Sequence, residues 1–399
     1  MKRIALVCSL ILLMSCANKE TVIQEIPFQF GVNNAEPNLV ARDGMLTLSW
    51  VTSVRGKEAT LQFSQLKEGT WEAPKKVASG DDWFVNWADF PANAVNGDLI
   101  LTSYLKKSAT GTYTYDVVLN LQKLSGEIVK ENFLLNTDGM HAEHGFVSMI
   151  PNLDGGFFVT WLDGRNTVKK DTEGHHSPMT IRVAEVSKEG VISNEKELDS
   201  STCDCCQTSI TMTESGPVIV YRDRSKKEIR DIYITRRIAG IWTEPTPVFN
   251  DGWKIPGCPV NGPKIVSSKK NISVAWFTAA NDTPKVNLSF SLNGGAHFET
   301  PIQINDAAAI GRVDVLFLNP KEVLVSYMEK DEKGTFLKCK KVALDGTISD
   351  AFVISEIGGS RSTGVPQLEI FENEVYAVWT VSVDKKNQLK SVKFNIEGL

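Results

Sequence analysis

Seven copies of one sequence unit constrain the fold of this chain more than any other feature. In each unit, a turn containing Gly, Asp or Asn is followed by alternating apolar residues that end in an aromatic residue. These aromatics are Trp50, Tyr104, Trp161, Tyr221, Trp276, Tyr327 and Trp379, spaced 51 to 60 residues apart. Alternation indicates β-strands, and a repeat of about 50 residues is typical of a β-propeller. We therefore predict an all-β chain with seven four-stranded blades.

The two ends of the repeat array predict how the ring closes. The seventh unit supplies only three strands, whereas residues 24–28 (QEIPF) have the pattern that precedes the fourth strand in other units. We expect this N-terminal strand to complete the last blade, which closes the ring and hides two sheet edges. The prediction is a single propeller domain over residues 23–399.

Residues 1–15 have the composition of a secretory signal peptide. Lys2 and Arg3 precede an apolar run that is too short to span a bilayer. The run ends in LLMSC at Cys16, which resembles the bacterial lipobox and implies cleavage before Cys16 and lipidation of its thiol. We expect residues 16–22 to form a lipidated tether that anchors the protein to a membrane of the bacterial cell envelope, outside the cytoplasm. A plain signal peptide with a chance cysteine is the alternative.

Two stretches resemble a known family. Residues 291–298 (SLNGGAHF) are similar to the Asp box of sialidases and other BNR-repeat propellers, and residues 64–71 are a poorer copy. The stretch 203–262, with CDCCQT and GWKIPGCPVNGP, resembles bacterial sialidase-like lipoproteins. The resemblance implies an exo-sialidase-like glycoside hydrolase that acts on acidic sugars, and it offers a six-bladed ring as the alternative fold. The early Arg-Ile-Pro motif of sialidases is missing.

Candidate site residues gather in the loops expected on one face of the ring, because links between blades share a face with the links between second and third strands. Arginine pairs with carboxylates through two parallel hydrogen bonds. The candidate substrate-binding residues are Arg165, Arg222, Arg224, Arg312, Arg361, Trp83 and Trp253. The candidate catalytic acids or bases are Asp163, Asp223 and Glu143, which need burial or a charged neighbour to tune their pKa. Solvated loops and salt bridges between blades are the alternative for each of them.

Four of the six cysteines from Cys16 onward are clustered. Cys203, Cys205 and Cys206 lie in the loop that enters the fourth unit, and Cys258 lies in the loop that enters the fifth. Two interpretations stay open: disulfides in an oxidising compartment, or a Zn or Cu site that also uses His141 and His144. His175 and His176 lie in the same region of the sequence. No other cofactor is expected.

Composition and motifs leave three functions open. A formal net charge of −5 and a pI of about 5.7 argue against a nucleic-acid partner. The first function is an enzyme that acts on a carbohydrate or another small anionic ligand. The second is a non-catalytic propeller that binds glycans or proteins. The third is a metal-binding or redox lipoprotein that uses the Cys and His residues.

Overall fold

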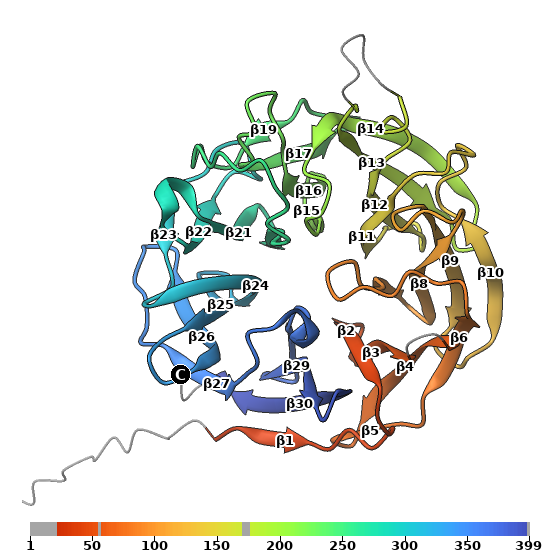
Figure 1. Cartoon of the computed structure of the whole chain (residues 1–399). Helices are drawn as coiled ribbons and strands as arrows, with labels where there is room; N and C mark the ends of the chain where they lie inside the picture. The colour runs from red at the N-terminus through yellow and green to blue at the C-terminus, as the bar shows by residue number, and fades with distance from the viewer. Residues whose placement is uncertain (1–21, 55–56, 170–175, 397–399) are drawn as a thin grey trace, which may run out of the picture.

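The computed structural model describes residues 22–54, 57–169 and 176–396, and these residues form one ring of seven blades (Figure 1). The signal peptide, Cys16, all of the tether except Val22, and His175 lie outside the described residues. Each blade is an antiparallel sheet whose first strand lies nearest the centre of the ring. The prediction of seven four-stranded blades is confirmed, and the six-bladed alternative is wrong.

The strands follow the repeat order along the chain. Blades 1 and 2 contain β2 (Asn34–Arg42), β3 (Met45–Ser53), β4 (Ala59–Lys67), β5 (Thr70–Trp71) and β6 (Lys75–Gly80), then β7 (Asn93–Asn96), β8 (Leu99–Lys107), β9 (Tyr115–Lys123) and β10 (Ile128–Leu134). Blades 3 and 4 contain β11 (His144–Pro151), β12 (Phe157–Asp163), β13 (Met179–Val186) and β14 (Ile192–Thr202), then β15 (Ser209–Thr213), β16 (Gly216–Arg222), β17 (Ile232–Ile238), β18 (Ile241–Trp242) and β19 (Thr246–Pro247). The outer strand is split in two in blades 1 and 4.

The remaining blades are equally regular. Blades 5 and 6 contain β20 (Lys264–Ser268), β21 (Asn271–Thr278), β22 (Lys285–Ser291) and β23 (Ile302–Gln303), then β24 (Ala308–Asn319), β25 (Glu322–Lys330), β26 (Thr335–Ala343) and β27 (Phe352–Glu356). Blade 7 contains β28 (Gln367–Phe371), β29 (Glu374–Val383) and β30 (Lys386–Asn395). Two short 3-10 helices lie in loops, at Ala280–Asp282 and Arg361–Thr363. Among the described residues, no helix has the length and apolar character that crossing a membrane requires.

The N-terminal strand β1 (Gln24–Ile26) closes the ring as predicted. It pairs antiparallel with β30, with Glu25 opposite Val392, and the Ser391 hydroxyl donates to the carbonyl of Ile26 at 2.7 Å. Figure 1 shows β1 lying along the outer side of β30, although the two strands come from opposite ends of the chain.

The repeated aromatic residues form the core. All seven lie on the second strand of their blade and are buried, and Trp50, Trp161, Trp276 and Trp379 have no exposed surface. Removing such a side chain costs roughly 3–5 kcal/mol in other proteins, because both burial and packing are lost. The alternation that reveals the repeat is therefore the pattern that packs one blade against the next.

Three inner strands carry a β-bulge near their first residues. The register of β2, β11 and β24 shifts between Ala35 and Asn38, between Gly145 and Ser148, and between Gly311 and Asp314. Each bulge holds a non-glycine residue at positive φ: Glu36 at 59°, Phe146 at 53° and Arg312 at 52°. This conformation costs roughly 1–2 kcal/mol, and bulges of this kind redirect side chains next to functional sites.

Candidate functional site

The candidate site lies where the central channel opens on the face of the loops between blades. The inner strands of all seven blades line a cavity of about 290 Å³. Asp89, Phe146 and Gln207 line the cavity near the loop side, because they lie in or next to the links that precede β7, β11 and β15. We call this end, together with Trp87 and Arg312, the channel mouth.

Arg312 is a buried cation without a carboxylate partner. Its side chain is 8% exposed, and its Nη1 donates to the carbonyls of Ser360 and Gly364, both at 2.9 Å. The guanidinium carbon lies 4.7 Å from the centroid of the Trp87 ring. No salt bridge to Arg312 occurs among the described residues. Burial and the nearby charge of Arg361 lower the pKa of Arg312 to about 10.

Two neighbouring arginines without an acidic partner make a local excess of positive charge. Arg361 is exposed in the link between blades 6 and 7, whereas Arg312 is fixed by the bulge of β24. The backbone N–H of Arg312 also donates to Asn261 Oδ1 at 2.8 Å. This pair is suited to a carboxylate or sulfate group of a ligand, because the guanidinium presents donors in a fixed plane.

Acidic groups gather on the other side of the mouth. The Tyr115 hydroxyl donates to Glu143 Oε1 at 2.7 Å and lies 3.4 Å from Asp89 Oδ2. Burial raises the pKa of Glu143 to about 7, although the hydrogen bond from Tyr115 lowers it. Burial, and then the charge of Asp89, also raises the pKa of Glu36 well above its usual value. We call Glu36, Asp89 and Glu143 the carboxylate cluster.

The bulge of β11 positions Asp89. The backbone N–H of Phe146 donates to Asp89 Oδ1, and a Cβ atom added at Gly145 would overlap the Asp89 carboxylate. Burial raises the pKa of Asp89 well above its usual value, and the Phe146 hydrogen bond opposes this shift. Only a glycine at position 145 therefore lets this carboxyl group approach the strand.

The arginine pair and the carboxylate cluster flank one tripeptide. Trp87 packs against Arg312, and Asp89, two residues later, belongs to the carboxylate cluster. Two residues of extended chain span at most about 7 Å, so the backbone positions that carry Trp87 and Asp89 lie close together in one link. The Gln207 side chain bridges the loops, because its Nε2 donates to the carbonyl of Ala88 at 2.6 Å and its Oε1 accepts from Gly262 N–H at 2.9 Å.

Asp163 and Arg165 belong to a largely buried network of blade 3, which adjoins the carboxylate cluster because Gly164 N–H donates to the Glu143 carbonyl at 2.7 Å. Arg165 Nε and Nη2 donate to the two Asp163 oxygens at 2.7 Å each, and Arg165 also pairs with Glu195 at 2.9 Å. Burial pushes the pKa of Asp163 upward, but the hydrogen bonds from Arg165 and Trp161 and the charge of His144 together hold that pKa below its usual value. Trp161 Nε1 donates a further hydrogen bond to Asp163. Both charges are fully engaged by the protein.

Arg222 and Arg224 are also engaged by protein groups. Arg222 is 1% exposed, donates to the carbonyls of Arg230, Asn261 and Phe277, and lies 4.9 Å from the ring of the buried Trp253. Arg224 pairs with Asp204 at 2.9 Å and with Glu228 at 2.8 Å. These residues tie the loops of blade 4 to their neighbours.

The last two candidates lie at other positions on the ring. Asp223 is half-buried, and burial, followed by the charge of Asp199, raises its pKa to about 7. Trp83 stacks on Tyr104 with ring centroids 4.0 Å apart, and its backbone bridges to Lys106 of β8. Among the described residues, neither Asp223 nor Trp83 makes a hydrogen bond, ion pair or ring contact with Arg312 or Arg361.

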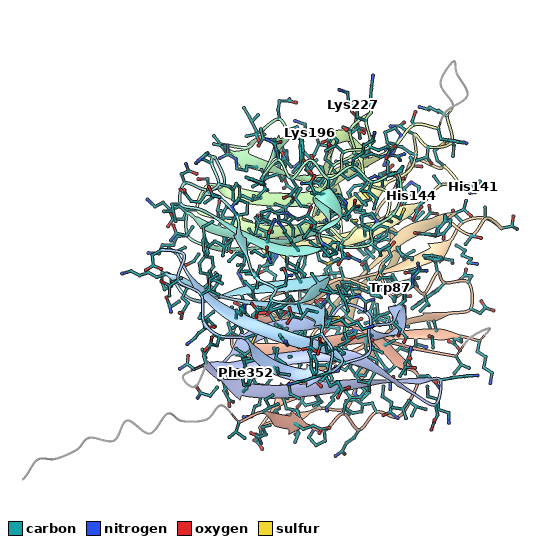
Figure 2. The ribbon with its side chains drawn as sticks, turned by 60° about the vertical axis from the view of Figure 1, so that its left-hand side comes forward. Trp87, His141, His144, Lys196, Lys227 and Phe352 are labelled. Carbon is teal, nitrogen blue, oxygen red and sulfur yellow. The ribbon has the colours of Figure 1, made fainter. Side chains whose placement is uncertain are left out.

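The four clustered cysteines come together, but without the histidines. Cys203 Sγ lies 3.9 Å from Cys205 Sγ and 3.7 Å from Cys206 Sγ, whereas Cys258 interacts with the Cys205 thiol from the next loop and lies outside this group of three. All four are free thiols, since a disulfide joins its sulfur atoms at about 2.05 Å. His144 instead lies 3.1 Å from Asp138, and His141 is exposed. In Figure 2, Trp87, His141 and His144 lie toward the same side of the ring.

Sequence reasoning missed four residues at the mouth: Glu36, Trp87, Asp89 and Tyr115. Trp87 and Asp89 follow Trp83 in one link rich in aromatic and acidic residues, so this link was the available signal. Glu36 and Tyr115 lie within strands, and no pattern in the sequence distinguishes them from ordinary strand residues.

Comparisons with known proteins find relatives by structure and not by sequence. No family model matches the chain, and no curated protein matches it. A polysaccharide lyase of family PL25, an ulvan lyase, superposes with a TM-score of 0.58 at 8% identity, over 92% of this chain and 95% of its own. The polysaccharide lyase Uly1 gives 0.53 at 9% identity, over 93% and 92%. The endosialidase of phage phi92 gives 0.52 at 9% identity, over 94% and 69%. These likenesses show a propeller fold that is shared with carbohydrate-active enzymes.

Proposed function

We propose that this protein is a carbohydrate-active propeller that binds an acidic glycan at the channel mouth and cleaves it. The observation that carries the proposal is the buried Arg312, which has no carboxylate partner among the described residues, lies beside Arg361, and packs on Trp87 of the link that also carries Asp89 of the carboxylate cluster. A ligand carboxylate or sulfate would supply the negative charge that the protein does not supply.

Glu143 is the proposed acid or base. A general acid–base group is most effective when its pKa lies near the working pH, and burial raises the pKa of Glu143 to about 7. Tyr115 has no exposed surface, so we assign it a positioning role: its hydroxyl fixes Glu143 Oε1. Asp223 has a similar pKa, but it is not part of the mouth.

The structural neighbours are consistent with an acidic glycan. One ulvan lyase structure, with a TM-score of 0.56 to this chain at 8% identity, carries a bound fragment written GlcA(1-4)Rha3S, which names an acidic sugar. The phage protein is an endosialidase, and sialic acid also carries a carboxylate. Cleavage of terminal sialic acid, which the sequence resemblance implies, is the finer form of this proposal.

The test is a panel of acidic polysaccharides, a fluorogenic sialoside, and neutral glycans as the matched control. Hydrolysis releases reducing ends, whereas elimination next to a carboxylate creates a double bond that absorbs in the ultraviolet, so two assays separate the reactions. We expect turnover of an acidic substrate only, a loss of about 10²–10⁴-fold for Glu143→Gln, and little change for Asp223→Asn. Binding without any product would show a glycan-binding propeller instead.

We also propose that the chain is a lipid-anchored protein of the cell envelope, on the strength of the LLMSC sequence that ends at Cys16. The test is fractionation of bacterial cells that express the full chain. The unaltered protein is expected in the membrane fraction, and Cys16→Ser is expected to remove it from there. An unchanged distribution would contradict the anchor.

A further inference from the structure

We propose that Cys203, Cys205, Cys206 and Cys258 together bind one thiophilic closed-shell metal ion, Zn²⁺ or Cu⁺, as a structural centre beside the channel mouth. The proposal is independent of glycan cleavage. It concerns the two loops that surround the mouth, residues 203–208 between blades 3 and 4 and residues 248–263 between blades 4 and 5.

The sulfur positions fit a tetrahedral ion. A Zn–S bond of about 2.3 Å places the sulfur atoms of a tetrahedral site about 3.8 Å apart. The two separations from Cys203 Sγ are 3.7 and 3.9 Å, and the sulfur atoms of Cys203, Cys205 and Cys206 all lie within 4.8 Å of one another. Cys258, on the second loop, interacts with the Cys205 thiol, but its sulfur atom is not within 4.8 Å of all three others, so the exposed loop would move inward for Cys258 to become the fourth ligand.

A hydrogen bond from an arginine at the cluster suits a metal-bound thiolate. Arg230 Nη1 donates to Cys203 Sγ at 3.1 Å, which is the type of hydrogen bond that orients and stabilises such a thiolate.

The charges near the cluster balance a tetrathiolate centre. When Zn²⁺ replaces the four thiol protons, the centre carries a net charge of −2. Arg222, Arg224 and Arg230 lie around it, and the acidic groups in contact with these arginines are Asp204 and Glu228. The three arginines and two carboxylates have a net charge of +1. This charge partly offsets the −2 of the buried centre.

Exposure differs among the four cysteines in a way that suits metal loading. Cys203 and Cys206 are buried, Cys205 is partly exposed, and Cys258 is exposed. Three thiols from one loop therefore form a preorganised three-sulfur site, and the exposed Cys258 lies where an ion from solvent can reach it.

The centre would join two loops that already touch at the mouth. Gly262 N–H donates to Gln207 Oε1, and a Cβ atom at Gly262 would collide with the backbone of Gln207. Asn261 in the second loop accepts the N–H of Arg312. A metal held by Cys206 and Cys258 would therefore hold the loops that carry Gln207 and Asn261.

The experiment uses the full chain, purified under reducing and anaerobic conditions, and measures metal content after gel filtration. We expect about one Zn²⁺ or Cu⁺ per chain, and the visible bands of tetrahedral cobalt thiolate when Co²⁺ is loaded. Removal of the metal by a chelator is expected to lower the melting temperature. Separate titrations with Zn²⁺ and Cu⁺ show which ion is retained, and either one supports the centre.

Two variants and a control keep the proposal falsifiable. Cys206→Ser is expected to abolish retention of the metal and the cobalt bands. Cys258→Ser alters an exposed residue, so the fold is expected to persist while metal affinity falls at least tenfold. Cys339→Ser, at a buried thiol of β26 outside the cluster, is the matched control and is expected to retain the metal. Reduced protein that binds neither ion, or variants that bind as well as the unaltered chain, would overturn the proposal.

Discussion

Two regions of this molecule bury arginine and carboxylate side chains in opposite ways. In blade 3, Arg165 and Asp163 meet through two hydrogen bonds of 2.7 Å, and the pKa of Asp163 is held below its usual value. At the channel mouth, Arg312 has no carboxylate partner in the part of the chain that the structure describes, and its pKa is lowered to about 10. The carboxyl groups across the mouth show the complementary effect, because their pKa values are raised.

The difference distinguishes charged groups that stabilise the fold, such as Asp163 and Arg165, from charged groups that are free to bind a ligand, such as Arg312. A buried ion pair compensates its own desolvation, whereas a buried unpaired ion destabilises the protein that carries it. Such groups persist where function requires them. Of the five arginines that the sequence offers as ligands for an anion, contacts therefore favour Arg312 and Arg361.

The largest expected effect is on folding. Asp163→Asn removes the carboxylate that accepts two hydrogen bonds from the partly buried Arg165, and we expect the free energy of unfolding to fall by about 3 kcal/mol, the lower end of the range for a fully buried pair. Urea unfolding followed by tryptophan fluorescence measures this. Asp223→Asn, at a half-buried aspartate without an arginine partner in the described salt bridges, is the control and is expected to change stability by less than 1 kcal/mol. Equal effects of the two variants would break the comparison.

The next prediction concerns the mouth, where we expect a substitution to change ligand affinity more than stability. Arg312→Met removes a charge that no carboxylate compensates, so we expect unfolding to change by less than about 1 kcal/mol. Affinity for an acidic glycan is expected to fall about 10–100-fold, since a hydrogen bond to a charged group contributes roughly 1.5–3 kcal/mol. Calorimetric titration and urea unfolding of Arg312→Met and Arg165→Met form the matched pair. A large loss of stability in the first variant, with unchanged affinity, would contradict the assignment.

The pH dependence of stability is expected to have opposite signs in the two regions. Glu143 has a folded pKa of about 7 and an unfolded pKa near 4.5, so the unfolded chain loses its proton first. Stability therefore falls as the pH rises between these values, and Glu143→Gln is expected to remove that part of the slope. The folded pKa of Asp163 is lowered, so its contribution is present above its unfolded pKa and is lost as the pH falls through the folded value. Melting temperatures from pH 3 to 8 test both signs, and a steeper slope in Glu143→Gln would refute the first.

The smallest effect is expected at Arg361. This side chain is exposed, so its attraction for an anion is screened by water and salt. Arg361→Ala is expected to weaken glycan binding about three- to fivefold at low salt and by less at 0.5 M salt. Affinity measured at several salt concentrations checks this, and a loss that salt does not reduce would show a direct, desolvated contact.

The fold was predictable because its determinants repeat. Trp50 and its six counterparts mark the same buried position in every blade, and a regular pattern survives the irregular loops between copies. Closure by residues 24–26 was predictable for the same reason, since one strand was missing at one end and present at the other.

The site was predictable only in part, because pairing is a property of space and not of sequence. Arg165 and Arg312 look alike in the sequence, yet one lies against Asp163 and the other against backbone carbonyls and Trp87. Glu36 lies at the mouth because it occupies a bulge at positive φ, and the flanking residues give no sequence signal for that conformation. The clustering of the cysteines was predictable. The sequence could not show that His144 lies outside this cluster, where the structure places it beside Asp138.

The direction of β1 has a consequence for how the molecule is presented. As the outermost strand of blade 7, β1 runs toward the face of the channel mouth, so its first residue, Gln24, lies on the opposite face. A chain held at Cys16 would therefore be anchored through the face opposite the channel mouth, and the mouth would point away from the bilayer.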